Sequence, residues 1–207
     1  MAGTTRRLLP ESLQNLYLNL LTPLIKALTR WGIHPNSLTL AGFVIACTAA
    51  AALITGNLRT GGMLILLGGL FDSMDGNLAR TTGMASRFGA LLDSAVDRYC
   101  EFVMFLGIAA YFIPAKDYLS LAATFLALCG SIMVSYTRAR AESLGFESKA
   151  GLMQRAERIV FLGFGALIHP AVFKLSLWLV AILANVTALQ RLRNASRQYA
   201  AENEKNP

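Results

Sequence analysis

The chain of 207 residues is 55% hydrophobic and 15% charged, with a mean hydropathy of +0.49 and a formal net charge of +7. This hydropathy argues against a soluble globular domain and favours an integral membrane protein of about six helices, at about 20 residues a span. In such a protein, basic cytoplasmic segments explain the positive excess better than a nucleic-acid partner does. The composition therefore predicts a single all-α membrane domain over residues 1–207 and no nucleic-acid binding.

The N-terminal stretch 10–31 carries apolar residues at helical spacing between polar ones. They recur at Leu13, Leu16, Leu20, Leu24, Leu28 and Trp31. The pattern predicts an amphipathic helix in the membrane interface, and packing of this helix against the other helices is equally compatible with it. Pro35 then disfavours helix at His34, so we expect Asn36 or Ser37 to cap the next helix.

Six apolar segments follow, and we expect each to span the membrane as a helix. Their predicted ranges are 37–56, 60–80, 87–113, 117–141, about 156–169 and 171–191. Six spans place both termini on one side of the membrane. Most Lys and Arg residues fall at helix ends on that side, and the other ends carry Arg59, Lys116 and Lys174. The positive-inside rule therefore predicts a cell-membrane protein with cytoplasmic termini.

Four aspartates lie in otherwise apolar sequence, where the second predicted span ends and the third begins. Asp72 and Asp75 are three residues apart, and Asp93 and Asp97 are four apart, so each pair shares one helix face. Between the pairs, the stretch 83–86 begins with Gly and ends with Ser, where a short turn would reverse the chain. Two antiparallel helices would then direct four carboxylates at one another, on the side of the termini.

Four clustered carboxylates need compensating charge close to lipid. One central Asp costs roughly 2.5 to 3.5 kcal/mol on insertion scales, and neighbouring like charges add to that cost. One or two Mg²⁺ or Mn²⁺ ions suit a ligand set made of oxygen alone. Pairing with Arg80, Arg87 and Arg98 is the alternative, but three arginines neutralise at most three of the four charges. The pattern therefore favours a metal site.

The aspartates belong to a longer pattern, which reads Asp72-x2-Asp75-Gly76-x2-Ala79-Arg80-x8-Gly89-x3-Asp93-x3-Asp97. It resembles the signature of the CDP-alcohol phosphotransferase family at every fixed position, and flanking similarity extends from about His34 to Arg193. The resemblance implies a membrane enzyme that displaces CMP from a CDP-linked lipid with an alcohol, using two metal ions. It implies metal binding by all four aspartates and the role of base for Asp97.

The resemblance also implies a site for the CDP-linked lipid. Gly76 and Ala79 have no bulk and would let a nucleotide approach the helix backbone, and Arg80 would pair with the diphosphate. Small residues also serve helix packing in membranes, and an arginine can simply extend to the interface. Further positions correspond to residues that line the lipid site in similar enzymes: Pro35, Asn36, Ser37, Leu38 and Ser86.

A second basic group comprises Arg138, Arg140, Arg155 and Arg191. Positive charge at cytoplasmic helix ends explains these residues without a site, and a pocket for a second phosphate is the sharper hypothesis. The segments SYTRARAESLG and LMQRAERIVFL resemble the branch that makes phosphatidylinositol phosphate, or its archaeal ether-lipid counterpart, from inositol phosphate. Arg138 stands where many members of that branch have lysine, and QRAER stands where ERPER is common. Glycerol 3-phosphate or another alcohol is therefore the alternative acceptor.

These observations together predict a CDP-alcohol phosphotransferase with inositol phosphate as its acceptor. The resemblance implies a homodimer, and the runs Gly61-Gly62 and Gly68-Gly69 would permit close helix contact. A cation or proton transporter is a weaker hypothesis, because its carboxylates would continue across the bilayer, whereas these cluster at one end of the spans. A non-catalytic member of the same fold is disfavoured because every signature aspartate is present.

Overall fold

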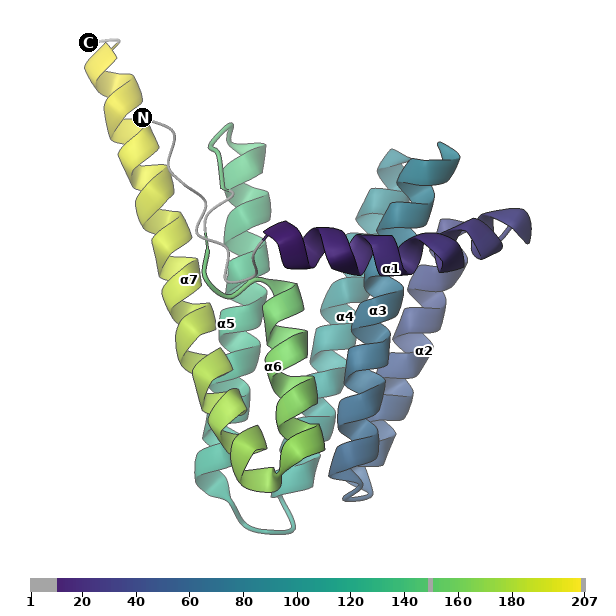
Figure 1. Ribbon diagram of the computed structural model, residues 1–207. Helices are drawn as coiled ribbons and strands as arrows, with labels where there is room; N and C mark the ends of the chain where they lie inside the picture. The colour runs from purple at the N-terminus through teal and green to yellow at the C-terminus, as the bar shows by residue number, and fades with distance from the viewer. Residues whose placement is uncertain (1–10, 149–150, 206–207) are drawn as a thin grey trace.

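The computed structural model describes residues 11–148 and 151–205, with side chains from residue 21 to residue 203, and its regular structure there is helical throughout. The helices in chain order are α1 (Glu11–Arg30), α2 (Pro35–Ile54), α3 (Leu58–Thr82), α4 (Arg87–Phe112), α5 (Tyr118–Ser143), α6 (Arg155–Ile168) and α7 (Pro170–Lys205). Figure 1 shows α2 to α7 running alongside one another and α1 lying across them near one end. The predicted all-α fold is therefore confirmed.

The predicted spans correspond to α2 through α7, and their ends agree within two residues except at the last. There the prediction ended at Arg191, whereas α7 continues to Lys205. About 20 residues suffice to cross a membrane, but residues 192–205 contain no Gly or Pro that would end the helix. Figure 1 shows the resulting C-terminal segment projecting beyond the other helices.

The start of α2 corrects one detail of the prediction, because His34 rather than Asn36 or Ser37 is the N-cap residue. The backbone N–H of Asn36 donates to His34 Nδ1 at 3.2 Å. Pro35 occupies the first helical position, where a missing N–H loses no helical hydrogen bond and the fixed φ favours the helix. Pro35 therefore starts α2 instead of delaying it.

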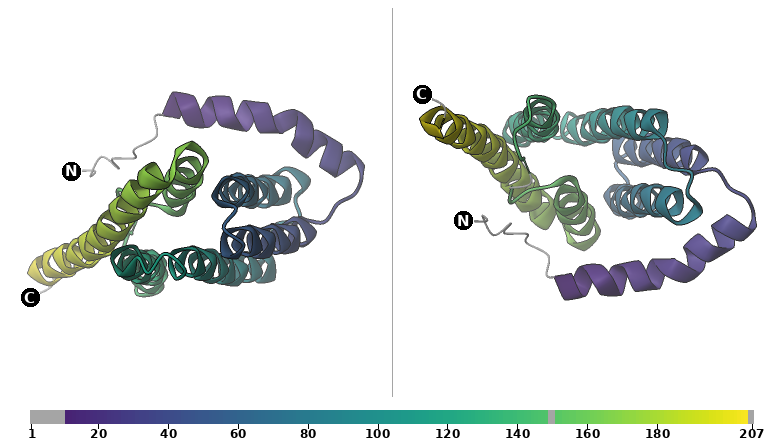
Figure 2. Two further views of the ribbon diagram at one scale, coloured as in Figure 1. Left: turned by 90° about the horizontal axis from the view of Figure 1, so that it is seen from below. Right: turned by 90° about the horizontal axis from the view of Figure 1, so that it is seen from above.

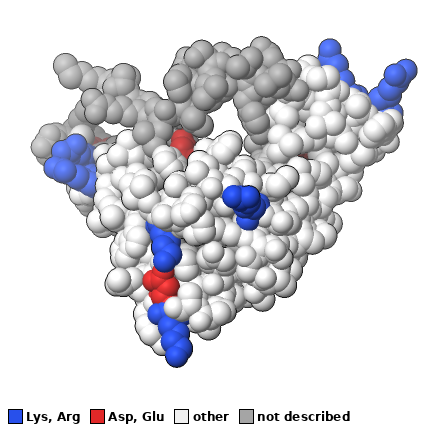
Figure 3. Space-filling model, turned by 60° about the horizontal axis from the view of Figure 1, so that its bottom comes forward, with Lys and Arg blue, Asp and Glu red and all other residues white. Residues whose placement is uncertain are grey.

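Three of the helices within the described chain are long and apolar enough to cross a membrane: α2, α5 and α7. The other members of the bundle differ for identifiable reasons. Charged side chains lower the hydropathy of α3, through its aspartates, and of α4, which also carries Arg98 and Glu101, and α6 has 14 residues. Figure 3 shows the opposite end from α1 as a surface with few charged side chains.

The helix α1 packs against the bundle through the half whose side chains are described. Its buried residues and their partners on α2 and α3 form one apolar cluster: Leu21, Ile25, Leu28, Leu38, Met74 and Leu78. The sequence pattern placed Leu24 and Trp31 on the same apolar helix face as Leu28. In the structure they are instead 43% and 72% exposed. The earlier members of that face lie outside the described side chains: Leu13, Leu16 and Leu20. Figure 2 shows α1 along the outside of the bundle.

Small residues bring α3 close to α6. A Cβ atom added to Gly62 would lie 2.8 Å from the carbonyl oxygen of Gly163, and one added to Gly69 would lie 2.7 Å from Ile159. Both glycine runs therefore have packing partners within this chain. The close contact between α3 and α6 also places Arg155, the first residue of α6, beside the aspartates of α3.

Candidate active site

The turn between α3 and α4 forms as the sequence predicts. Gly83 ends α3 with a φ of 69°, a left-handed conformation that glycine adopts without steric cost. The hydroxyl of Ser86 caps α4 by accepting a hydrogen bond from the N–H of Gly89 at 2.9 Å. This reversal places the two aspartate pairs on neighbouring antiparallel helices.

Three of the four aspartates form a compact carboxylate cluster. Asp72, Asp93 and Asp97 each place one carboxylate oxygen within 4.8 Å of the others. Asp93 Oδ1 is buried and has no hydrogen-bond partner among the described residues. A buried oxygen without a donor is costly, and an oxygen-only set at this separation suits a hard divalent cation. The residues present therefore fit a metal ion.

The fourth aspartate, Asp75, lies beside this cluster and is held by donors of its own. Thr39 of α2 donates its hydroxyl to Asp75 Oδ2 at 2.7 Å, and the N–H of Gly76 donates to Oδ1. Asp75 and Thr39 are 4% and 8% exposed. Sequence reasoning missed Thr39, whose visible signal was a hydroxyl one turn after Pro35 in a mostly apolar helix.

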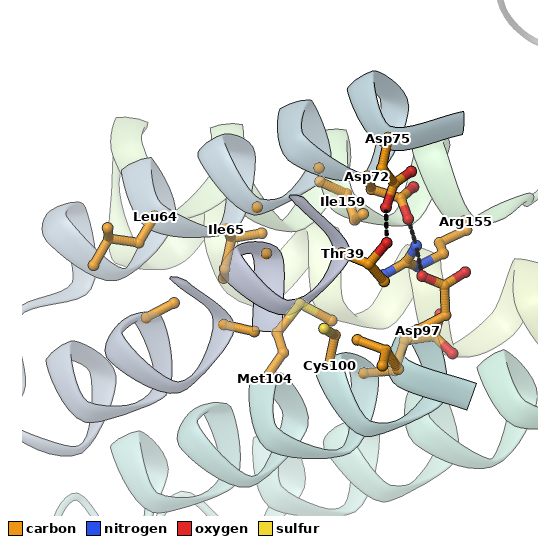
Figure 4. Close-up of a pocket in the computed structure, with 17 residues that line it drawn as sticks. Thr39, Leu64, Ile65, Asp72, Asp75, Asp97, Cys100, Met104, Arg155 and Ile159 are labelled. Carbon is orange, nitrogen blue, oxygen red and sulfur yellow. Dashed lines mark hydrogen bonds and ion pairs between the residues drawn. The ribbon is translucent and has the colours of Figure 1, made fainter. Parts of the chain in front are cut away.

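The strongest counter-charge at the cluster is Arg155, which the sequence had assigned to an acceptor phosphate. Arg155 Nη1 forms ion pairs with Asp72 Oδ1 and Asp97 Oδ1, as Figure 4 shows. The sequence offered three arginines as counter-charges in place of a metal ion, and one of them, Arg98, contacts Asp97 Oδ2 at 3.3 Å. The guanidinium of Arg80 instead donates to the side chain of a neighbouring α3 residue at 3.0 Å. A helix distant in sequence therefore supplies the main positive charge.

A hollow with about 590 Å³ of empty space adjoins the aspartates at the ends of α2, α3 and α4. Its lining includes most of the residues assigned to the CDP-linked lipid: Pro35, Asn36, Gly76, Ala79, Arg80 and Ser86. Ser37 and Leu38 are outside this lining, and Leu38 is buried against α1. The structure therefore brings six of the eight predicted residues together around one space.

A second hollow, with about 550 Å³ of empty space, lies deeper between α2, α3, α4 and α6. Figure 4 shows Asp72, Asp75, Asp97 and Arg155 at one end of this hollow and Leu64 and Ile65 at the other. Thr39 and Asp75 line both hollows, so this hydrogen-bonded pair forms part of the wall between them.

The remaining arginines of the predicted acceptor group point to different partners. Arg138 pairs with Glu142 at 2.9 Å, and Arg140 is exposed and donates to Ser143 at 3.5 Å. Arg191 is buried and donates to a backbone carbonyl of α5. The structure thus places Arg138 and Arg191 on the closely packed helices α5 and α7, whereas Arg155 is engaged with the aspartates.

The model of the CDP-alcohol phosphatidyltransferase family matches residues 32–189. The chain belongs to this family. Archaetidylinositol phosphate synthase from Pyrococcus horikoshii is 38% identical over 174 residues, which cover 84% of this chain and 89% of the relative. The resemblance drawn from the aspartate signature is therefore confirmed, and the protein is an integral membrane enzyme of a transferase family.

Solved structures of phosphatidylinositol phosphate synthase from Mycobacterium tuberculosis share the fold of this phosphatidyltransferase. The form with CDP-DAG bound has a TM-score of 0.77 and 30% identity, over 86% of this chain and 94% of that chain. The complex with manganese and citrate has a TM-score of 0.76 and 31% identity, over 84% and 88%. The metal in that relative agrees with the carboxylate cluster found here.

A second arginine bridge, which sequence reasoning missed, lies one helical turn deeper in this phosphatidyltransferase. Arg158 Nη2 of α6 pairs with Glu101 Oε1 of α4, and Arg158 Nη1 donates to the Met153 carbonyl at 3.2 Å. Arg158 is 1% exposed and Glu101 is 3% exposed. The sequence spacing indicates such a pair, because Glu101 follows Asp97 by four residues and Arg158 follows Arg155 by three, so each lies on the same helix face as the residue before it.

Proposed function

We propose that this phosphatidyltransferase transfers the phosphatidyl group of CDP-diacylglycerol, or of its ether analogue, to inositol phosphate and releases CMP. The observation that carries the proposal is the arrangement at one end of the bundle. There the carboxylate cluster, the hollow lined by signature residues and the first arginine of α6 all meet. The names of the relatives, which are phosphatidylinositol phosphate and archaetidylinositol phosphate synthases, support the choice of acceptor.

For the metal, we propose that Asp72, Asp75, Asp93 and Asp97 hold two Mg²⁺ or Mn²⁺ ions. When bound, such ions offset the negative charge of the phosphates and of the departing CMP. The unpartnered oxygen of Asp93 supports this assignment, because it lacks a donor from the described protein. Asp75 keeps the hydrogen bond from Thr39, which fixes the direction of its carboxylate.

The outer hollow would receive the CDP moiety. Gly76 and Ala79 leave the α3 backbone open to the nucleotide, and Arg80 lies at the rim, where its guanidinium can bind a diphosphate. Asn36 and Ser86 would add polar contacts from α2 and from the start of α4. Ser37 and Leu38 are the weaker members of the predicted set, because they lie outside this lining.

For the proton transfer, we propose that Asp97 takes the proton of the acceptor hydroxyl. In the structure, Arg155 pairs with Asp97, and an ion-paired carboxylate is a poor proton acceptor. Arg155 would therefore leave Asp97 before the reaction and bind the phosphate of the acceptor. Arg138 and Arg191 would complete that phosphate site from α5 and α7, with Arg140 at its exposed edge.

For the membrane arrangement, we propose one domain over residues 1–207, with α2 to α7 crossing the bilayer and α1 lying at its cytoplasmic surface. The distribution of charge supports this orientation, because the end opposite α1 carries few charged side chains (Figure 3). Cytoplasmic termini and a cytoplasmic site suit a CDP-linked substrate made inside the cell. A homodimer is proposed from the family resemblance, since both glycine runs are occupied by packing within the chain.

The decisive experiment is a CMP-release assay with purified protein, CDP-diacylglycerol or its ether analogue, and Mg²⁺. We expect CMP release with inositol phosphate, little release with free inositol and none after EDTA treatment. A preference for glycerol 3-phosphate would retain the phosphate site but contradict the inositol assignment. Preference for an unphosphorylated alcohol would contradict the phosphate site itself. A transporter is disfavoured because the hollow ends in apolar residues: Leu64 and Ile65 lie about two helical turns from Asp72 on α3, and Met104 follows Glu101 on α4.

A further inference from the structure

Two arginine–carboxylate bridges join α6 to α4, one helical turn apart. Arg155 reaches Asp97, and Arg158 reaches Glu101. The two carboxylates share one face of α4 and the two arginines share one face of α6, given spacings of four and three residues. The helices α4 and α6 are not among the most closely packed pairs of the bundle, and the hollow of Figure 4 is lined by both. The two bridges therefore connect helices that have little direct packing.

The two bridges differ in burial and in their neighbours. The side chains of Arg155 and Asp97 are 18% and 15% exposed, whereas those of Arg158 and Glu101 are 2% and 4% exposed. Arg158 also donates to the Met153 carbonyl at 3.2 Å, and the Met153 N–H donates to a threonine hydroxyl of α7 at 3.1 Å. The deeper arginine therefore fixes the start of α6 with respect to both α4 and α7.

Stability alone is a weak reason to bury the Glu101–Arg158 pair. Taking two charges out of water is costly, and a well-packed apolar pair of similar volume is often as stable or more stable. An ion pair with hydrogen bonds differs from an apolar contact because it joins two specific groups in one geometry. The Glu101–Arg158 ion pair therefore fixes the position of α6 relative to α4 at a point one helical turn from Arg155.

We propose that Glu101 and Arg158 are positioning residues that hold Arg155 in place for the phosphate of the acceptor. The inference rests on the proposed function, in which Asp72 and Asp97 exchange Arg155 for metal ions. The ion pair between Arg155 and Asp97 is then broken. The deeper ion pair between Arg158 and Glu101 contains no aspartate of the signature and stays formed, so α6 keeps its position while Arg155 turns to the acceptor.

The first test compares Michaelis constants in Glu101→Gln and Arg158→Lys, which preserve most of the side-chain volume. We expect the KM for inositol phosphate to rise roughly 10- to 100-fold, by analogy with residues that orient metal ligands, whose removal costs about that factor in affinity or activity. The KM for the CDP-linked lipid should stay close to that of the parent protein. Lys174→Met is the matched control, because it breaks an ion pair at the opposite end of the bundle. It should leave both constants unchanged.

The second test measures Mn²⁺ affinity by electron paramagnetic resonance without any substrate. Because Arg155 competes with metal ions for Asp72 and Asp97, a loosened Arg155 should compete less. Mn²⁺ should therefore bind more tightly to the double variant Glu101→Leu/Arg158→Leu than to the parent, in the direction of Arg155→Ala. The double variant is compared because it keeps the net charge, whereas Glu101→Gln alone removes a negative charge from the lining of the same hollow. A purely structural role would give the opposite result: weaker Mn²⁺ binding together with a rise in both KM values. That outcome would overturn the inference.

The double variant Glu101→Leu/Arg158→Leu keeps the test decisive if a single variant does not fold, because both members of the buried pair are removed together. Arg98, which also pairs with Glu101 at 3.5 Å, keeps its contact with Asp97 at 3.3 Å. An unchanged KM for inositol phosphate in this folded double variant would also overturn the inference. If the parent protein releases no CMP with inositol phosphate, the proposed function fails on its own. The Mn²⁺ comparison still decides whether the deeper pair controls Arg155.

Discussion

The two ends of the helical bundle hold their charged side chains in different ways. At the end opposite α1, Lys174 pairs with Asp117 at 2.6 Å, and the N–H and hydroxyl of Ser120 donate to the same carboxylate at 3.1 and 2.8 Å. The hydrogen bond from Lys174 and those from Ser120 lower the pKa of Asp117 to about 2. At the other end, Asp93 Oδ1 has no donor among the described residues, and Arg155 is shared between Asp72 and Asp97.

This difference distinguishes a structural ion pair from a functional cluster. The Asp117 carboxylate is fully supplied with donors by Lys174 and Ser120. Lys174 lies over the ring of Phe112, which stacks on Phe173 with the ring centroids 5.9 Å apart. The carboxylate cluster is incompletely satisfied by the protein, which is expected where a ligand supplies the remaining partners. The comparison predicts that substitutions at the carboxylate cluster affect activity far more than stability, and that the opposite holds for Lys174.

The largest effect is expected from Asp93→Asn. The substitution removes a charged oxygen that no described residue satisfies. CMP release should fall by more than roughly 10- to 100-fold, which is the typical loss when a residue that only orients a metal ligand is removed. The midpoint of thermal unfolding should stay the same or rise. The rate and the melting temperature should be measured on the same preparation. Strong destabilisation with retained activity would show that the cluster is structural.

A large effect on the chemical step is expected from Asp97→Asn. Removal of a general base typically costs roughly 10²- to 10⁴-fold in rate, while the nucleotide is held by other groups. Binding of the CDP-linked lipid, measured by calorimetry, should therefore stay near the parent value while turnover falls. Loss of lipid binding with a normal rate at saturation would make Asp97 a binding residue instead.

A smaller effect is expected from Thr39→Val, which keeps the shape of the side chain but removes the hydroxyl that donates to Asp75. Mn²⁺ affinity should fall roughly 10- to 100-fold, as for other residues that orient a metal ligand. Thr39→Ser retains the hydroxyl and is the matched control. Equal Mn²⁺ affinity in Thr39→Val and the parent would exclude an orienting role for Thr39.

The smallest effect is expected from Lys174→Met, at about 1 kcal/mol or less at neutral pH, because exposed ion pairs contribute little. Activity should not change. Since the folded pKa of Asp117 is about 2, below its ordinary 3.8, the pair stabilises the fold above pH 3.8 and loses this contribution as the pH falls toward 2. Unfolding curves of the variant and the parent should therefore converge across this pH range. A constant difference would contradict the pairing.

The sequence by itself determined the local features of this phosphatidyltransferase. Apolar segment lengths predicted α2 to α7 within two residues at nearly every end, because helices that cross apolar surroundings need long uninterrupted apolar runs. The signature spacing placed the aspartates on facing helices, since Gly83 and Ser86 specify a turn through their own backbone and capping preferences. The His34 cap and the continuation of α7 to Lys205 were missed as local details.

Only the tertiary structure decided which partners those aspartates have. Arg155 lies 58 residues from Asp97 in the chain, and Arg158 lies 57 residues from Glu101. Helical periodicity says which residues share a face, but it does not say which helices become neighbours. That choice depends on side-chain packing, such as Gly62 of α3 against α6, which brings the start of α6 to the carboxylates. The arginine bridges follow from this packing because both arginines are carried on α6.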